Sequence, residues 1–192
     1  MEYFPFFIDI EGQPVLIAGG GAVALRKAEK LLPYRPRLRA VAPEFCSGFA
    51  ALPSVTCLRR HFEDADLEGC RVVIAATNDK EENRRIAALC RDRGILLNAV
   101  DDRDNCGFLF PALVKRGPVC VGISTGGASP VAAAWLREQI DALLPENLEA
   151  VIAELERARL QCRREIPDEK ERAAALRSLL LRLLKPDENA PD

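Results

Sequence analysis

A run of three glycines, Gly19-Gly20-Gly21, joins a short apolar segment to a helical pattern, and no other feature limits the possible folds as strongly. Residues 15–18 before it (VLIA) are typical of a buried strand. Residues 22–32 after it (AVALRKAEKLL) place apolar side chains on one helical face, and Pro33 ends the pattern. A strand that turns directly into a helix predicts a β-α-β unit and a parallel sheet.

The same alternation continues through the first two-thirds of the chain. Further strands are predicted at residues 38–42, 55–58, 72–76 and 95–100, with helices at 45–52 and 81–93 and a polar turn at 64–69. Short β-branched runs separated by helical patterns indicate a parallel sheet that is covered on both faces. We therefore expect an α/β fold with a Rossmann-like domain over residues 1–112.

The pattern changes after this domain. Residues 108–114 and 119–124 are apolar strands joined by Lys-Arg-Gly-Pro, which predicts a hairpin, and a helix follows to residue 144. We assign residues 113–144 to a small β-containing region. Residues 145–192 are expected to form a helical domain that ends in a polar tail.

The glycine run also predicts a ligand. Gly19-x-Gly21-x-x-Ala24 between a strand and a helix matches a dinucleotide fingerprint, in which the glycines allow a tight turn and close approach of the pyrophosphate. The helix start would face the phosphates with free N–H groups. The alternative is a tight turn with no ligand. The expected cofactor-binding residues are Gly19, Gly20, Gly21, Ala22, Val23, Ala42, Pro43, Thr77 and Asn78.

The choice between NAD and NADP stays open at this stage. The second strand ends without the acidic residue that usually binds the ribose 2′-hydroxyl, although Glu44 follows slightly later. Arg59 and Arg60 close the next strand and are within reach of a 2′-phosphate in the predicted fold.

Two further motifs suggest chemistry. Asp101 follows the fifth strand and is a candidate base, while Asp102 and Asp104 are alternatives to it, and the whole cluster could also be a solvated turn. The loop Ser124-Thr125-Gly126-Gly127 precedes a helix start at Ser129-Pro130. These four residues are candidates for binding substrate carboxylates, and the alternative is an ordinary capped helix. We expect His61, the single histidine, to be structural.

Composition excludes several classes of protein. Lys and Arg number 27 against 29 Asp and Glu, so no net field favours nucleic acid or an anionic membrane. No apolar run approaches the roughly 18 residues of a membrane span, and no basic leader precedes an apolar segment at the N-terminus. The seven cysteines are odd in number and lack a C-x-x-C pair, which indicates reduced thiols and no structural metal site. We expect a cytoplasmic protein.

These motifs together resemble the precorrin-2 dehydrogenase/sirohydrochlorin ferrochelatase family, the dehydrogenase part of siroheme synthase. The resemblance runs from about residue 3 to residue 184. Its carriers are Phe4-Pro5-Phe6-Phe7, the segment from Gly19 to Ala28, Ala75-Ala76-Thr77-Asn78-Asp79, Asn98-Ala99-Val100-Asp101, Phe108-x-x-Pro111-Ala112 and Ser124 to Pro130.

The resemblance implies a homodimer that oxidises precorrin-2 to sirohydrochlorin with NAD⁺, and it makes residues 113–144 the dimerisation region. Many family members then insert Fe²⁺, and the aspartate matching Asp101 is implicated in both steps. The region of Ser124 and Thr125 is implied to meet the substrate, with phosphorylation there left open. We expect methylation to be carried out by another protein. The alternative from another class is a non-catalytic NAD-binding regulatory module of the potassium-uptake-regulator type.

Overall fold

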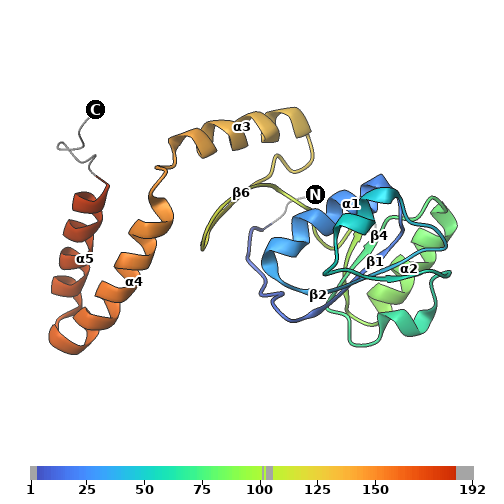
Figure 1. Ribbon diagram of the computed structural model, residues 1–192, viewed down its shortest axis with the longest axis horizontal. Helices are drawn as coiled ribbons and strands as arrows, with labels where there is room; N and C mark the ends of the chain where they lie inside the picture. Colours follow the sequence, from blue (N-terminus) through green and yellow to red (C-terminus); the bar gives the residue numbers. More distant parts are fainter. Residues whose placement is uncertain (1–3, 101, 103–105, 185–192) are drawn as a thin grey trace. The chain divides into compact units, whose positions relative to one another are not determined.

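The computed structural model describes residues 4–100, 102 and 106–184, and the chain divides after Phe110 into two compact units (Figure 1). Each unit has its own apolar core. Two clusters of buried side chains fill the first unit, and a smaller cluster lies in the second.

The first unit is built on a five-stranded parallel sheet with the order β3-β2-β1-β4-β5. Its strands are β1 (Pro14–Ala18), β2 (Arg37–Val41), β3 (Thr56–Leu58), β4 (Val72–Ala75) and β5 (Leu96–Ala99). The chain moves outward from β1 through β2 to β3 and then returns to place β4 on the other side of β1. In open α/β sheets of this kind, ligands bind beyond the carboxyl ends of the strands at this reversal.

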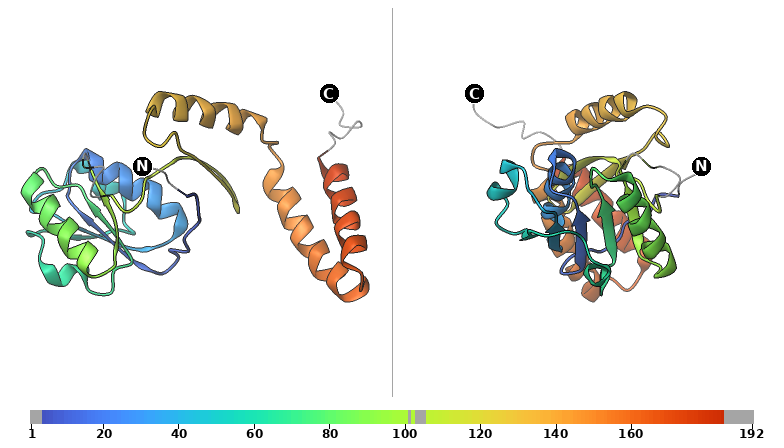
Figure 2. Two further views of the ribbon diagram at one scale, coloured as in Figure 1. Left: turned by 180° about the vertical axis from the view of Figure 1, so that it is seen from behind. Right: turned by 90° about the vertical axis from the view of Figure 1, so that its right-hand side faces the viewer.

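Helices α1 (Ala22–Leu31) and α2 (Lys80–Asp92) cover opposite faces of the sheet (Figure 2). Successive residues of β1 alternate between the two faces: Val15 and Ile17 join the cluster that contains the buried side of α1, and Leu16 and Ala18 join that of α2. All four are fully buried. This double coverage explains why β1 is a continuous apolar run, and the expected Rossmann-like fold is confirmed.

Short one-turn helices replace two of the predicted segments. The helix expected at residues 45–52 is the 3-10 helix η2 (Ser47–Ala51), and the polar turn at 64–69 contains the 3-10 helix η3 (Asp64–Leu67). A third, η1 (Leu32–Tyr34), follows α1.

One strand prediction was wrong at its beginning. We expected a strand over residues 108–114, but β6 spans Ala112–Arg116. Phe108 and Phe110 instead pack against the core of the first unit, and their rings are 5.3 Å apart. Pro111, which has no N–H to donate, comes between this packed segment and β6.

The second unit consists of a hairpin and three helices. Strands β6 and β7 (Val119–Ile123) pair antiparallel through a two-residue turn, in which Gly117 has a φ of 53°. Helix α3 (Pro130–Leu143) packs on this hairpin through Ala133. Helices α4 (Leu148–Glu165) and α5 (Glu169–Leu183) pack against each other as a helical hairpin.

Within the described ranges no helix is both long and apolar enough to cross a bilayer. Each of the seven cysteines lies in the described part of the chain, and none of them forms a disulfide. The residues that the structure describes hold no group of three or more His, Cys, Asp or Glu side chains that could bind a metal ion.

Candidate functional site

The principal candidate site is a cleft of about 710 Å³ in the first unit, at the carboxyl ends of β1, β2 and β4. The three segments that follow these strands form most of its wall. Its lining residues are Gly19, Gly20, Gly21, Val41, Ala42, Pro43, Glu44, Phe45, Cys46, His61, Phe62, Ala76, Thr77, Asn78, Asp79 and Glu82. The cleft therefore lies where the sheet order reverses, as expected for a ligand site in this fold.

The three glycines on the floor of the cleft meet different constraints. Gly19 has a φ of +134°, and a Cβ there would lie 2.2 Å from the carbonyl oxygen of Ala76. A Cβ on Gly20 would lie 2.0 Å from the carbonyl oxygen of Glu44. Gly21, in contrast, has no atom within 4 Å of such a Cβ. Packing alone explains the first two glycines, but the bare backbone of Gly21 faces open space.

The segment after β2 is fastened to the glycine loop. The backbone N–H of Cys46 donates to the carbonyl oxygen of Gly20 at 2.8 Å. At the preceding position, the N–H of Gly19 donates to the carbonyl oxygen of Val41 at 2.9 Å. These bonds fix the position of Glu44 relative to the loop.

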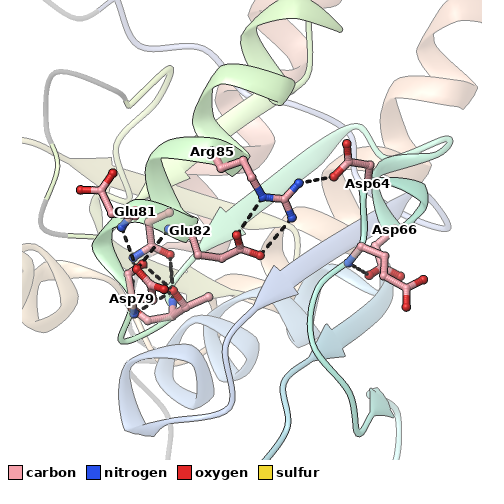
Figure 3. Close-up of polar contacts among 9 residues, drawn as sticks. Asp64, Asp66, Asp79, Glu81, Glu82 and Arg85 are labelled. Atoms are coloured by element: carbon pink, nitrogen blue, oxygen red, sulfur yellow. Dashed lines mark hydrogen bonds and ion pairs between the residues drawn. The ribbon is translucent and has the colours of Figure 1, made fainter.

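The opposite wall comes from the segment after β4, which is held by the buried side chain of Asn83. The Oδ1 atom of Asn83 accepts hydrogen bonds from the backbone N–H of Thr77 at 3.1 Å and from its hydroxyl at 2.7 Å. The Nδ2 atom of Asn83 donates to the carbonyl oxygen of Thr77 at 3.1 Å. Asp79 then caps α2 by accepting from the N–H groups of Glu81 and Glu82 (Figure 3).

Acidic side chains near the cleft are paired with arginines behind it. Arg85 bridges Glu82 and Asp64, and these bonds raise the pKa of its guanidinium (Figure 3). The buried Asp66 accepts two hydrogen bonds from Arg60, at 2.8 Å and 2.5 Å, and this pairing holds the pKa of Asp66 below its ordinary value.

These features fit a dinucleotide. No side chain caps α1 at Gly21, so the first N–H groups of the helix remain for a ligand, and anions are favoured at a helix start. The open space over Gly21 leaves room for a pyrophosphate at the backbone. The residues present therefore suit the phosphate-binding mode of a Rossmann domain.

The cleft brings together seven of the nine residues predicted to bind cofactor. Ala22 and Val23 begin α1 and are not among the lining residues. Seven further lining residues were not predicted to contact a ligand: Val41, Phe45, Cys46, Phe62, Ala76, Asp79 and Glu82. All of them except Glu82, which lies in α2, stand at or within a few residues of a strand end, and that position was the available signal. His61, expected to be structural, is an exposed residue of the cleft wall.

Asp101 and Asp104 lie outside the described residues. The described neighbours of Asp101 show how the end of β5 is held. The buried Asn98 donates to the carbonyl oxygen of Phe108 at 3.1 Å. The thiol of Cys106 donates to the carbonyl oxygens of Ala99 at 3.0 Å and Asp102 at 3.2 Å.

The second predicted loop lies in the other unit and is bonded mainly to itself. The hydroxyl of Thr125 accepts from the N–H of Ser129 at 3.1 Å and donates to its carbonyl oxygen at 3.0 Å. Ser124 accepts from the N–H of Gly126, and Ser129 caps α3 at Ala132. Gly126 and Gly127 have φ values of 60° and 76°, so glycine suits both positions.

Comparison with known proteins agrees with these features. Residues 6–112 match the family described as "Putative NAD(P)-binding", and residues 116–143 match "Sirohaem biosynthesis protein central". A siroheme synthase of Thioalkalivibrio sulfidiphilus is 40% identical over 171 residues, which are 88% of this chain and 35% of that protein. A siroheme synthase of Azotobacter vinelandii is 37% identical over 175 residues, 90% of this chain and 38% of that protein. The chain thus spans about a third of the length of these curated relatives.

The solved structure of SirC, a precorrin-2 dehydrogenase, has a similar fold. The two superpose with a TM-score of 0.69 at 23% sequence identity, and the match covers 92% of this chain and 89% of that one. Because the first family model covers more than half of the chain and includes the whole cleft, the chain belongs to this NAD(P)-binding family and takes a nicotinamide cofactor.

Proposed function

We propose that this chain oxidises precorrin-2 to sirohydrochlorin with NAD⁺, as a step of siroheme biosynthesis. The observation that carries the proposal is the glycine-floored cleft at the sheet reversal, in a chain that aligns over 88% of its length with a siroheme synthase. The oxidation removes a hydride and a proton from the tetrapyrrole. Bound NAD⁺ would supply the hydride acceptor.

The residues proposed to hold the dinucleotide are those predicted from the sequence. Gly19, Gly20 and Gly21 would admit the pyrophosphate, and the N–H groups of Ala22 and Val23 would donate to it. Ala42 and Pro43 would line the side after β2, and Thr77 and Asn78 the side after β4. The contacts that Asn83 makes with Thr77 keep this second side in place.

Asp101 is proposed as the base that takes the proton. It follows β5, whose carboxyl end lies at the same sheet edge as the glycine loop, because all five strands are parallel. A carboxylate at that position can accept a proton while the hydride leaves. The bonds from Asn98 and Cys106 hold the chain on both sides of this aspartate.

The loop from Ser124 to Gly127 is proposed to bind carboxylates of the substrate. The hydroxyl of Thr125 both accepts and donates within the loop, whereas that of Ser124 only accepts, so the O–H of Ser124 can still donate to an anion. At the start of α3, Pro130 has no N–H and the N–H of Ala132 is bonded to Ser129. This refines the prediction from sequence: the hydroxyl of Thr125 shapes the loop, and that of Ser124 is the one proposed to contact the substrate.

A homodimer is proposed, with the region of residues 113–144 as its contact. Helix α3 exposes several large apolar side chains, among them Trp135 at 58% and Leu143 at 81% exposure. Apolar exposure of this kind is typical of an association surface. Sedimentation velocity at two protein concentrations would measure the mass directly, and a monomer at micromolar concentration would contradict a stable dimer.

The regulatory-module alternative is not favoured. The match to the sirohaem central family covers residues 116–143, which include β7 and α3 and which a bare nucleotide-sensing module does not require. We also propose that the same active site inserts Fe²⁺, as a substrate, into sirohydrochlorin in a second step. It is tested in the same experiment as the oxidation.

The test is an anaerobic incubation of the full chain with precorrin-2 and NAD⁺, in which NADH and sirohydrochlorin are followed by absorbance. We expect both products to rise together in a one-to-one ratio and only in the presence of protein. Fe²⁺ is added afterwards, and insertion faster than in a protein-free control would establish the second step. Tight NAD⁺ binding with no turnover would contradict the enzyme and support the regulatory module.

A further inference from the structure

The charges around the cleft bear on which nicotinamide dinucleotide it accepts. NADP⁺ differs from NAD⁺ by a phosphate on the adenosine ribose, which brings close to two negative charges. In Rossmann domains the group that meets this ribose usually comes just after the second strand. Here β2 ends at Val41, and Glu44 is the first charged residue after it.

Glu44 is both exposed to the cleft and fixed in position. It belongs to the cleft wall, and its carbonyl oxygen lies against Gly20, where a Cβ would approach it to 2.0 Å. The hydrogen bond from Cys46 to Gly20 holds the following residues on the same loop. Because the glycine loop would bind the pyrophosphate, Glu44 is kept close to the adjoining ribose.

The charged residues that line the cleft are acidic, and the nearest arginine at this end, Arg59, lies over Phe45 of the cleft wall. Among its described lining residues there is no lysine or arginine, whereas Glu44, Asp79 and Glu82 are all acidic. Of these three, Glu82 is paired with Arg85 and Asp79 caps α2, so the carboxylate of Glu44 is the one that would meet a 2′-phosphate. Like charges brought together in this way oppose binding and give selectivity.

The two arginines that follow β3 have other partners. The guanidinium of Arg60 is paired with the buried carboxylate of Asp66. That of Arg59 lies over the ring of Phe45, with its carbon 5.5 Å from the ring centroid. Neither arginine lines the cleft, so the sequence-level route to NADP through these residues is not supported by their contacts.

We propose that Glu44 determines cofactor specificity: its carboxylate binds the ribose 2′-hydroxyl of NAD⁺ and repels the 2′-phosphate of NADP⁺. The inference rests on nucleotide binding by this cleft and is independent of the tetrapyrrole. It explains how the chain selects NAD⁺ without an acidic residue at the last position of β2.

The test measures binding of each nucleotide by calorimetry, using the full chain without tetrapyrrole. We expect the wild type to bind NAD⁺ at least about 30-fold more tightly than NADP⁺, which corresponds to roughly 2 kcal/mol. Glu44→Gln keeps the size of the side chain and removes its charge, so the preference should fall about tenfold. Glu44→Arg should reverse it, because the new guanidinium can pair with the phosphate.

A matched control separates local from general charge effects. Glu29→Gln removes the same charge from an exposed position on α1 outside the cleft. The preference of this variant for NAD⁺ over NADP⁺ should equal that of the wild type. Thermal unfolding of each variant checks that the fold is retained. Arg59→Ala tests the competing route: if it abolishes NADP⁺ binding, Arg59 leaves Phe45 to take the phosphate.

The outcomes separate the two proposals. An unchanged preference in Glu44→Gln, or a wild type that prefers NADP⁺, overturns the role of Glu44. Selective NAD⁺ binding that depends on Glu44 but comes without oxidation of precorrin-2 supports this inference and contradicts the proposed reaction. If neither nucleotide binds, both are overturned.

Discussion

The first and third glycines of the loop should respond to the same substitution in opposite ways. Gly19→Ala would place a Cβ 2.2 Å from the carbonyl oxygen of Ala76, so the two must separate by more than 1 Å to reach ordinary contact. The φ of +134° adds backbone strain of about 1–3 kcal/mol for any residue other than glycine. Overpacking of this kind costs a further 1–3 kcal/mol or so.

The total loss expected for Gly19→Ala is therefore about 2–6 kcal/mol of the free energy of unfolding. A typical domain has only about 5–15 kcal/mol in all, so the variant should fold but unfold at a much lower urea concentration. Gly21→Ala meets no neighbour and has a φ of −81°, and its cost as the residue before α1 should be about 1 kcal/mol or less.

Gly21→Ala, which should cost little stability, is the variant expected to weaken NAD⁺ binding. The Cβ of Gly21→Ala would occupy the space proposed for the pyrophosphate, and a loss of about 1.4 kcal/mol or more would weaken NAD⁺ binding at least about tenfold. Urea unfolding and calorimetric titration of both variants measure the two quantities. The reasoning is refuted if Gly19→Ala unfolds at the wild-type midpoint, or if Gly21→Ala binds NAD⁺ as tightly as the wild type.

Three further substitutions test the site and its support. Asp101→Ala should abolish precorrin-2 oxidation and leave the NAD⁺ dissociation constant within about twofold, because the base acts only on the bound substrate. Asp66→Asn should lower the free energy of unfolding at pH 7 by about 1–3 kcal/mol, since it weakens the charged bonds from Arg60 to a buried acceptor. Because the pKa of Asp66 is lowered in the folded protein, this difference should be present above about pH 4 and shrink as the pH falls through the folded pKa. Asn98→Ala should cost about 1–3 kcal/mol in urea unfolding, because the carbonyl oxygen of Phe108 loses its donor.

Each of these has a specific contrary result. Survival of activity in Asp101→Ala would assign the proton to Asp102 or Asp104, or remove the need for a side-chain base. A stability difference for Asp66→Asn that stays constant across the whole acid titration would place its origin in packing and not in charge. Glu68→Gln, at an exposed position two residues away, is the matched control and should unfold like the wild type at each pH.

Local sequence signals predicted most of the elements that build the cleft. The apolar run at residues 15–18 must be buried on both faces, and a glycine run between it and a helix permits few geometries other than a strand-turn-helix junction. The same holds for Thr77 and Asn78, which follow an apolar strand directly and lie in the cleft wall. These predictions rest on contacts within a few residues, so the sequence contains the information for them.

Predictions failed or stayed open at residues whose structure or role depends on a partner far away in the chain. Phe108 and Phe110 have the composition of a strand but pack on the first unit, where the ring of Phe110 lies 4.0 Å from the ammonium of Lys27. From the sequence, Arg60 was a candidate to bind a phosphate, but in the structure its guanidinium is paired with the carboxylate of Asp66. Neither partner can be identified from local periodicity.

By itself, then, the sequence determined the alternating strands and helices, the glycine loop and the near balance of acidic and basic residues, because these depend on local conformational preference and on composition. Only the tertiary structure decided which strand ends meet, that Cys46 bonds the segment after β2 to Gly20, and that no lysine or arginine among the described residues lines the cleft. The physical reason is that the sheet order brings the ends of β1, β2 and β4 together, and such long-range pairing leaves no periodic trace in the sequence.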